Sequence, residues 1–124
     1  MAVTYPLFVF EKDDQSMKLV EDSRRILFHM EAIDIENGEY VFWDANGNGV
    51  SVAVSVTAFK SELTDVTSCA ALFPLRDAFA LYAKALGLSE INVDGPPSEV
   101  WRRILKELER RPKKRGFFSR VFSK

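Results

Sequence analysis

One segment of the chain has the residue types and spacing that open a calcium-binding loop. It runs Asp44-Ala45-Asn46-Gly47-Asn48-Gly49 and matches Asp-x-Asn-x-Asn-Gly. Such a loop needs a bidentate glutamate at its twelfth position, which here is Ser55, and one carboxylate is too little charge to dehydrate Ca²⁺. Because Asn and Gly tolerate the positive φ of tight hairpin turns, we predict a turn between two strands and no metal site.

The chain contains one histidine and one cysteine, His29 and Cys69, too few for a transition-metal site or a Cys-His couple. Cys69 has small neighbours and no adjacent cation, which predicts a buried, inert thiol. The adjacent acids Asp13-Asp14 and Glu21-Asp22 lie in polar stretches typical of solvated turns and caps. No glycine-rich loop leads into a helix, as a phosphate site requires. We therefore predict no catalytic residue and no cofactor.

The strands that must position these residues are predicted from alternation and turn signals. Residues 5–10 and 17–20 read as two strands across the polar turn 13–16. Residues 39–44 and 50–57 read as a second pair, because Val50, Val52, Val54 and Val56 alternate with small residues. A short edge strand is predicted at 91–93.

Three helices are predicted from apolar spacing and end signals. The first begins at Asp22 or Ser23 and runs to residue 30. The second begins at Pro74 and ends before Gly87, and the third runs from Ser98 to Pro112. Hairpins without regular strand–helix–strand alternation favour an α+β fold: an antiparallel sheet of about four or five strands, with three helices packed mainly on one face.

The chain of 124 residues has the length of one domain, which we place at residues 1–111, followed by a basic C-terminal tail at 112–124. Residues 110–124 hold seven basic residues and no acid, whereas residues 1–109 hold 10 basic and 18 acidic residues, a net charge of −8. No basic leader, long apolar stretch or cysteine pair is present, so we expect a cytoplasmic protein.

The tail interleaves cations with three phenylalanines. If it is helical, Phe117, Phe118, Val121 and Phe122 share one face. This composition suits an anionic membrane surface, such as the inner face of the cell membrane. A partner protein or a second copy of the chain fits as well, whereas the acidic body disfavours nucleic acid. The predicted contact residues are Lys113, Lys114, Arg115, Phe117, Phe118, Arg120 and Phe122.

The acidic body is itself a candidate for binding a basic partner. Tyr40, Phe42 and Trp43 lie in one predicted strand, where Phe42 takes one face and Trp43 the other. We therefore consider an exposed aromatic patch at these residues, with complete burial of both faces as the alternative.

The segment from Ile33 to Gly47 contains Ile-Glu-Asn-Gly-Glu-Tyr before a hairpin ending in Asp-x-x-Gly. In this respect the chain resembles a loose group of short bacterial proteins of unknown function, some of them similar to immunity proteins of toxin systems. The resemblance implies a bacterial, non-enzymatic protein that binds a partner.

Together these features predict a non-catalytic interaction protein. Its acidic body binds a partner protein, and its basic aromatic tail makes a second contact with a membrane surface or another protomer. The alternative is a small-ligand-binding domain or small enzyme with a pocket between the sheet and the helices.

Overall fold

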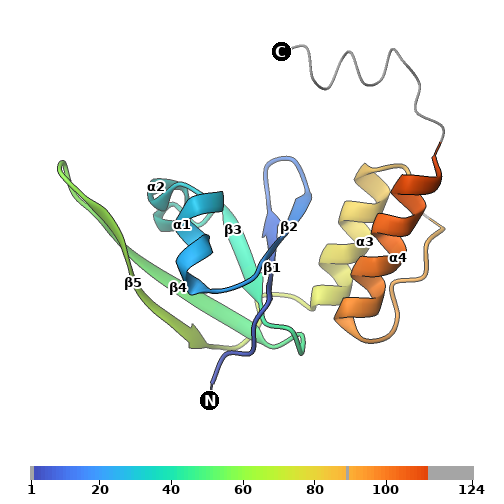
Figure 1. The fold of residues 1–124 in the computed structure, drawn as a ribbon, viewed down its shortest axis with the longest axis horizontal. Helices are drawn as coiled ribbons and strands as arrows, with labels where there is room; N and C mark the ends of the chain where they lie inside the picture. Colours follow the sequence, from blue (N-terminus) through green and yellow to red (C-terminus); the bar gives the residue numbers. More distant parts are fainter. Residues whose placement is uncertain (1, 89, 112–124) are drawn as a thin grey trace, which may run out of the picture.

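The computed structural model describes residues 2–88 and 90–111. Its centre is a five-stranded antiparallel sheet with the order β2-β1-β3-β4-β5 (Figure 1). The strands are β1 (Leu7–Glu11), β2 (Ser16–Val20), β3 (Tyr40–Trp43), β4 (Gly49–Val56) and β5 (Ser61–Ser68). The predicted α+β fold and antiparallel sheet are confirmed.

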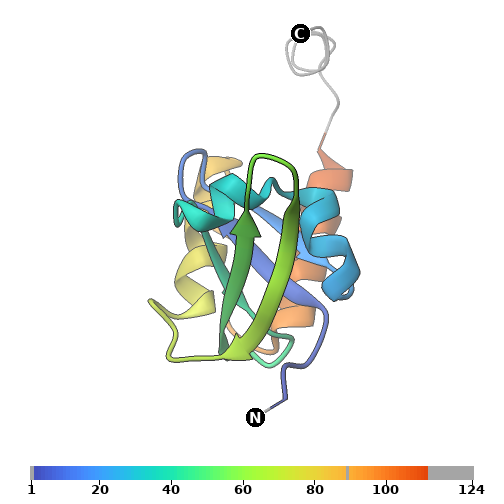
Figure 2. The ribbon, with the colours of Figure 1, turned by 90° about the vertical axis from the view of Figure 1, so that its left-hand side faces the viewer.

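Helices lie on both faces of this sheet. The two long helices, α3 (Leu75–Ala85) and α4 (Pro97–Arg110), pack side by side on one face. A 3₁₀ turn (Ser23–Arg25), α1 (Ile26–His29) and α2 (Ala32–Glu36) lie on the other face, under the long β4–β5 hairpin (Figures 1 and 2). The first predicted helix is thus short and lies opposite the other two.

The predicted hairpins and helix ends agree closely with the structure. Leu7 pairs with Val20 and Phe10 with Met17 across the first turn. Helix α3 ends before Gly87, which adopts a φ of 77°. Three differences remain: β5 and α2 were not predicted, and residues 91–93 form no strand because they lie against the helix pair as irregular chain.

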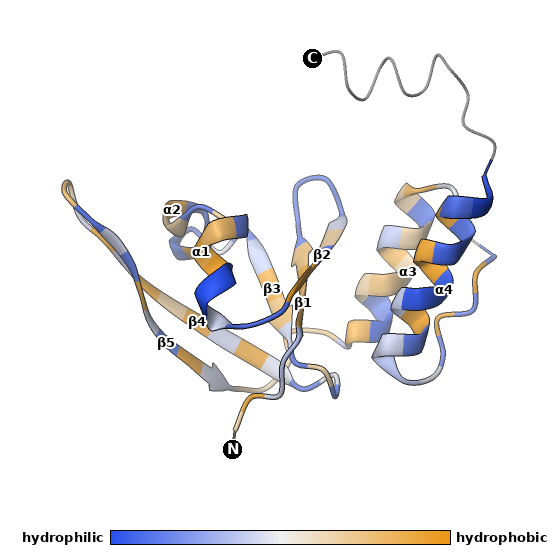
Figure 3. Ribbon diagram, viewed as in Figure 1, coloured by the Kyte–Doolittle hydropathy of each residue, from blue (hydrophilic) through white to orange (hydrophobic). Residues whose placement is uncertain are grey.

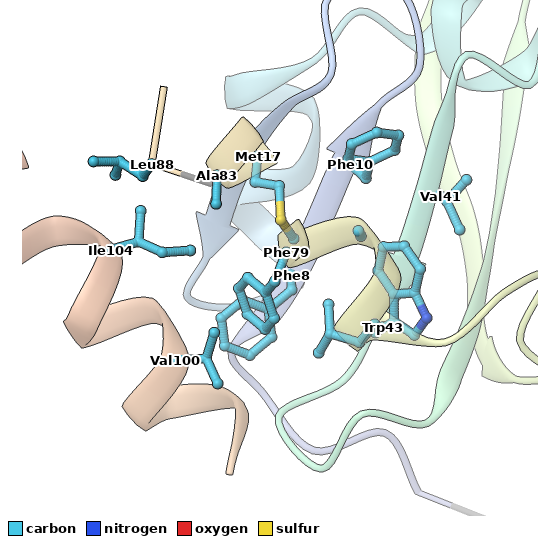
Figure 4. Close-up of a cluster of buried hydrophobic side chains, with 12 residues drawn as sticks. Phe8, Phe10, Met17, Val41, Trp43, Phe79, Ala83, Leu88, Val100 and Ile104 are labelled. Carbon is cyan, nitrogen blue, oxygen red and sulfur yellow. The ribbon is translucent and has the colours of Figure 1, made fainter. Parts of the chain in front are cut away.

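Strict alternation along β1 produces two separate cores. Phe8 and Phe10 point toward α3 and α4, where the Phe8 ring meets Phe79 edge-on at 5.4 Å (Figure 4). This core also holds Trp43, whose indole Nε1 donates to the Phe73 carbonyl at 3.0 Å. The burial of these aromatic rings fixes the helix pair on the sheet.

The second core lies on the opposite face, between the sheet and α1–α2. Leu7 and Val9 of β1 contribute to it, since they alternate with Phe8 and Phe10. Its buried members are Leu7, Val9, Val20, Ile26, Met30, Ile35, Phe42 and Val50. Both faces of the central strands are therefore covered.

The described chain ends at a residue that joins the two long helices. Arg111 donates from Nη1 to the Leu86 carbonyl at 2.6 Å and from Nη2 to the Gly87 carbonyl at 2.7 Å. These carbonyls lie at the end of α3, where a cation is favourable for the helix dipole. Arg111 thus fixes the point from which residue 112 continues.

Candidate functional site

The aromatic patch considered for β3 is not exposed. Phe42 is buried among the residues of the α1–α2 core, Trp43 is fully buried under α3, and Tyr40 is only partly accessible. The prediction is wrong because helices cover both faces of this strand, whereas it assumed that one face stays open. Phe42 and Trp43 therefore offer almost no surface to a partner.

The calcium-like segment forms the turn that connects β3 to β4, as predicted. Asp44 is buried, and its Oδ1 accepts from the backbone N–H groups of Asn46 at 2.9 Å and Asn48 at 3.0 Å. Its Oδ2 accepts from the Thr4 N–H at 3.4 Å. The carboxylate is therefore used to hold the turn and the N-terminal segment. Within residues 2–88 and 90–111, no three His, Cys, Asp or Glu side chains gather as metal ligands.

The thiol of Cys69 is exposed, so the prediction of a buried cysteine is wrong. The reason is local: its backbone N–H donates to the Gly49 carbonyl, which keeps the segment at the end of the sheet with the side chain outward. His29 is partly buried, with Nε2 3.9 Å from the Glu21 carboxylate, a distance too long for a hydrogen bond.

Carboxylates gather around Tyr40 at the end of the sheet that carries the β1–β2 turn. Hydrogen bonding to Asp34, partial burial and the charges of Asp34 and Asp13 raise the pKa of Glu39. Burial, followed by the charges of Glu11, Asp34 and Glu39, raises the pKa of Tyr40 to about 12. This surface therefore concentrates negative charge, which Lys18, with its Nζ 6.0 Å from the centre of the Tyr40 ring, offsets in part.

Three large apolar side chains in or next to one hollow are exposed to solvent. Phe28 of α1 is 75% exposed, Ile33 of α2 is 48% exposed, and Phe59 in the β4–β5 turn is 99% exposed. The hollow, of about 610 Å³, lies between the α1–α2 corner and the ends of β4 and β5. It is lined by Leu27, Phe28, His29, Met30, Glu31, Ala32, Ile33, Val56 and Ser61. We call this set, together with Phe59, the hairpin hollow.

The turn that carries Phe59 is held by local hydrogen bonds. The Thr57 hydroxyl accepts from the N–H groups of Phe59 at 3.3 Å and Lys60 at 3.0 Å. The Thr57 N–H donates to the Lys60 carbonyl at 2.9 Å. This turn projects Phe59 away from the sheet, and Figure 3 shows apolar colour at the hairpin tip. The backbone that carries the ring is thus restrained, so binding of a partner there would cost little backbone freedom.

The charged residues at the hairpin hollow are of both signs, with acids toward α2. Glu31 lines the hollow, and Asp34 and Glu36 follow on α2. On the opposite side Lys60 is paired with Glu62 at 2.9 Å. The carboxylate group around Tyr40 continues from α2 and does not line the hollow.

The predicted tail contacts at residues 113–122 lie outside the described residues. The structure does show the end of the molecule at which the chain reaches Arg111. Figures 1 and 2 place the end of α4 at the same end of the molecule as the β1–β2 turn and the tip of the β4–β5 hairpin. The acidic turn with Asp13 and Asp14 therefore shares this end with the start of the basic segment.

The exposed apolar residues were missed at the sequence level for identifiable reasons. Phe28 lies off the apolar stripe formed by Ile26, Leu27 and Met30, so helical spacing alone indicates that it points elsewhere. Phe59 gave no such signal, since its exposure follows from a hairpin whose second strand was not predicted.

Comparison with family models, curated proteins and solved structures finds no match for this chain. The resemblance to short bacterial proteins therefore stays a hypothesis. Among the described residues, no helix is both long and apolar enough to cross a bilayer.

Proposed function

We propose that this chain is a non-catalytic interaction protein whose body binds a partner protein at the hairpin hollow. The observation that carries the proposal is a hollow of about 610 Å³ whose lining includes the exposed Phe28 and Ile33, next to the turn that carries the exposed Phe59. Single exposed apolar residues are common, but two exposed apolar side chains in the lining of one hollow, with an exposed ring in the adjacent turn, are typical of binding surfaces. Aromatic side chains dominate the binding energy at most protein interfaces.

The partner is expected to be basic. Residues 1–109 carry a net charge of −8, and Glu31, the residue before α2, lines the hollow. An acidic surface speeds encounter with a basic partner and discourages acidic ones. The short bacterial proteins that this chain resembles include some that are similar to immunity proteins of toxin systems. Immunity proteins act by binding a partner without catalysis.

We propose that residues 112–124 make the second contact, with an anionic membrane surface or another protomer. Five cations and three phenylalanines support either surface. Acids near Arg111 would oppose close approach of the body to an anionic membrane, so the tail would hold the body at some distance from it. The matching location is the cytoplasm, in part at the inner membrane face.

A small-ligand-binding or enzymatic role has one observation in its favour. Asp34 raises the pKa of Glu39, as in paired carboxylates that transfer protons. These carboxylates are open to solvent and do not line the hairpin hollow, which leaves a substrate little enclosure.

Site-specific photo-cross-linking in the cells of origin tests the body contact. A photoreactive residue at position 59 should give a discrete protein adduct, and one at Leu105, a partly exposed residue of α4, should not. Equal, diffuse labelling from both positions would contradict a specific site. For the tail, sedimentation with anionic vesicles should be compared between the full chain and a chain ending at Arg111, at low and physiological salt.

A further inference from the structure

We infer that the hairpin hollow receives residues 112–124 of a second copy of this chain. The inference rests on the proposed function and names one occupant for its binding surface. It predicts an assembly in which each body is held by the tail of its neighbour.

The first support is chemical complementarity. The segment holds Lys113, Lys114, Arg115, Arg120 and Lys124, no acid, and three phenylalanines. The hollow offers apolar walls from α1, α2 and the hairpin, with Glu31 in its lining. Residues 1–111 carry 12 basic and 18 acidic residues, so body and tail attract one another overall.

The hairpin hollow and residues 112–124 carry complementary residue types. Phe28 and Phe59 are exposed rings that can pack against the phenylalanines of the incoming segment. Glu31 lines the hollow, where it can pair with the cations that precede Phe117. A purely apolar partner would leave Glu31 without an ion pair.

The position of Arg111 favours a neighbour over the segment's own body. Arg111 is fixed to the end of α3, and α3 and α4 cover the sheet face opposite to α1 and α2. To reach its own hollow, the segment must pass around the end of the sheet to the opposite face. A second copy can present its hollow without this detour, and the thirteen residues of 112–124 span up to about 44 Å when extended, enough to reach a neighbour. Reciprocal exchange between two copies closes the assembly with two-fold symmetry.

The test uses full-length chains and two complementary variants. The first, Phe28→Ser with Phe59→Ser, keeps the tail and removes the exposed ring that lines the hollow and the exposed ring in the adjacent turn. The second, with serine at Phe117, Phe118 and Phe122, keeps the hollow and removes the aromatic part of the tail. Leu72→Ser is the matched control, since Leu72 is 72% exposed and lies outside the hollow.

Sedimentation equilibrium at concentrations up to about 200 µM should show a dimer for the full chain and for Leu72→Ser. Each complementary variant should dissociate at least about tenfold more readily, and high salt should weaken the wild-type dimer. A mixture of the two variants should form a heterodimer, because one intact tail meets one intact hollow.

Three results would overturn the inference. They are a full chain that stays monomeric, a dimer that survives serine substitution of the tail phenylalanines, and a variant mixture that forms no heterodimer. A monomeric chain that still cross-links a different protein from position 59 would reject the inference and leave the proposed function standing. A monomer that sediments with anionic vesicles would assign the tail to the membrane instead.

Discussion

The guanidinium carbon of Arg25 lies 5.5 Å from the centre of the Phe28 ring, and the His29 ring meets that same ring edge-on at 5.3 Å. The Phe28 ring is therefore oriented by Arg25 of the preceding 3₁₀ turn and by His29 of α1, although the side chain is 75% exposed. A cation over an exposed ring contributes about 0.5–1 kcal/mol, enough to restrict rotamers without burying the side chain. An anchor held in this way loses less entropy when a partner binds.

Phe28→Ser should separate binding from folding. Because Phe28 is exposed and its main intramolecular contacts are with Arg25 and His29, we expect its loss to lower the free energy of unfolding by no more than about 1 kcal/mol. Binding at the hollow should weaken by at least about tenfold, since exposed aromatic anchors dominate interfaces. Urea unfolding and sedimentation equilibrium measure the two effects on one preparation. A large loss of stability with unchanged association would show that Phe28 is structural.

Gly49→Ala should destabilise the fold strongly. A Cβ at this position would lie 2.7 Å from the backbone Cα and N of Ala71 and 2.8 Å from the Cys69 carbonyl oxygen. Backbone atoms cannot move aside as a flexible side chain can, so we expect a cost of about 1–3 kcal/mol in thermal or urea unfolding.

Gly38→Ala is the matched control for this substitution. Gly38 has a φ of 74°, and a Cβ there meets nothing within 4 Å, so only backbone strain of about 1 kcal/mol applies. The account requires Gly49→Ala to cost more than Gly38→Ala. The reverse order would mean that segment 69–71 does not pack over β4 as described.

Asp44→Ala should loosen the β3–β4 turn. The substitution leaves the N–H groups of Asn46 and Asn48 without their acceptor and breaks the bond to Thr4. We expect a loss of about 2–4 kcal/mol. Asp44→Asn keeps one acceptor oxygen and should lose less. Added Ca²⁺ should not raise the melting temperature of the wild type, and a saturable rise would contradict the assignment of this segment as a plain turn.

Ionisation of Tyr40 should be delayed and linked to stability at high pH. Burial and nearby carboxylates raise the pKa of Tyr40 to about 12, and burial also raises the pKa of Tyr5 and Tyr82. An unfolded tyrosine ionises near pH 10, so between about pH 10 and 12 the unfolded chain releases a proton that the folded protein keeps. The stabilisation is complete below pH 10 and is lost as the pH rises through this window.

The measurements for Tyr40 are a tyrosinate absorbance titration and urea unfolding at several pH values. Tyr40→Phe should remove the latest step of the absorbance titration. It should also make the decline in stability above pH 10 shallower than in the wild type. An absorbance titration complete near pH 10 under folded conditions would contradict the packing of Tyr40 among Glu11, Asp34 and Glu39.

The sequence predicted those elements whose signals are local. Alternating valines specified β4, and Gly87 specified the end of α3. Strand β5 was not predicted from the sequence because Leu63 and Val66 are three residues apart, which breaks the alternation expected of a strand. An irregularity between Ala53 and Val54 pairs Leu63 with Val54 and Val66 with Val52, which places both side chains on the inner face.

The candidate site could not be predicted from the sequence, because it depends on which side chains are buried and which are exposed. The burial of Trp43 and the exposure of Phe59 both follow from which helix covers which face, and this is a property of tertiary packing. Charge segregation, by contrast, is visible in the chain directly, because residues 110–124 contain seven cations and no acid.

The most direct test of the central claim, that the hairpin hollow is a binding surface for a basic aromatic segment, is sedimentation equilibrium of a mixture of two full-length variants. One chain carries Phe28→Ser and Phe59→Ser, and the other carries serine at Phe117, Phe118 and Phe122. The account predicts that each chain alone is largely monomeric and that the mixture forms a heterodimer weakened by salt. A mixture that remains monomeric under conditions where the wild type dimerises would contradict it.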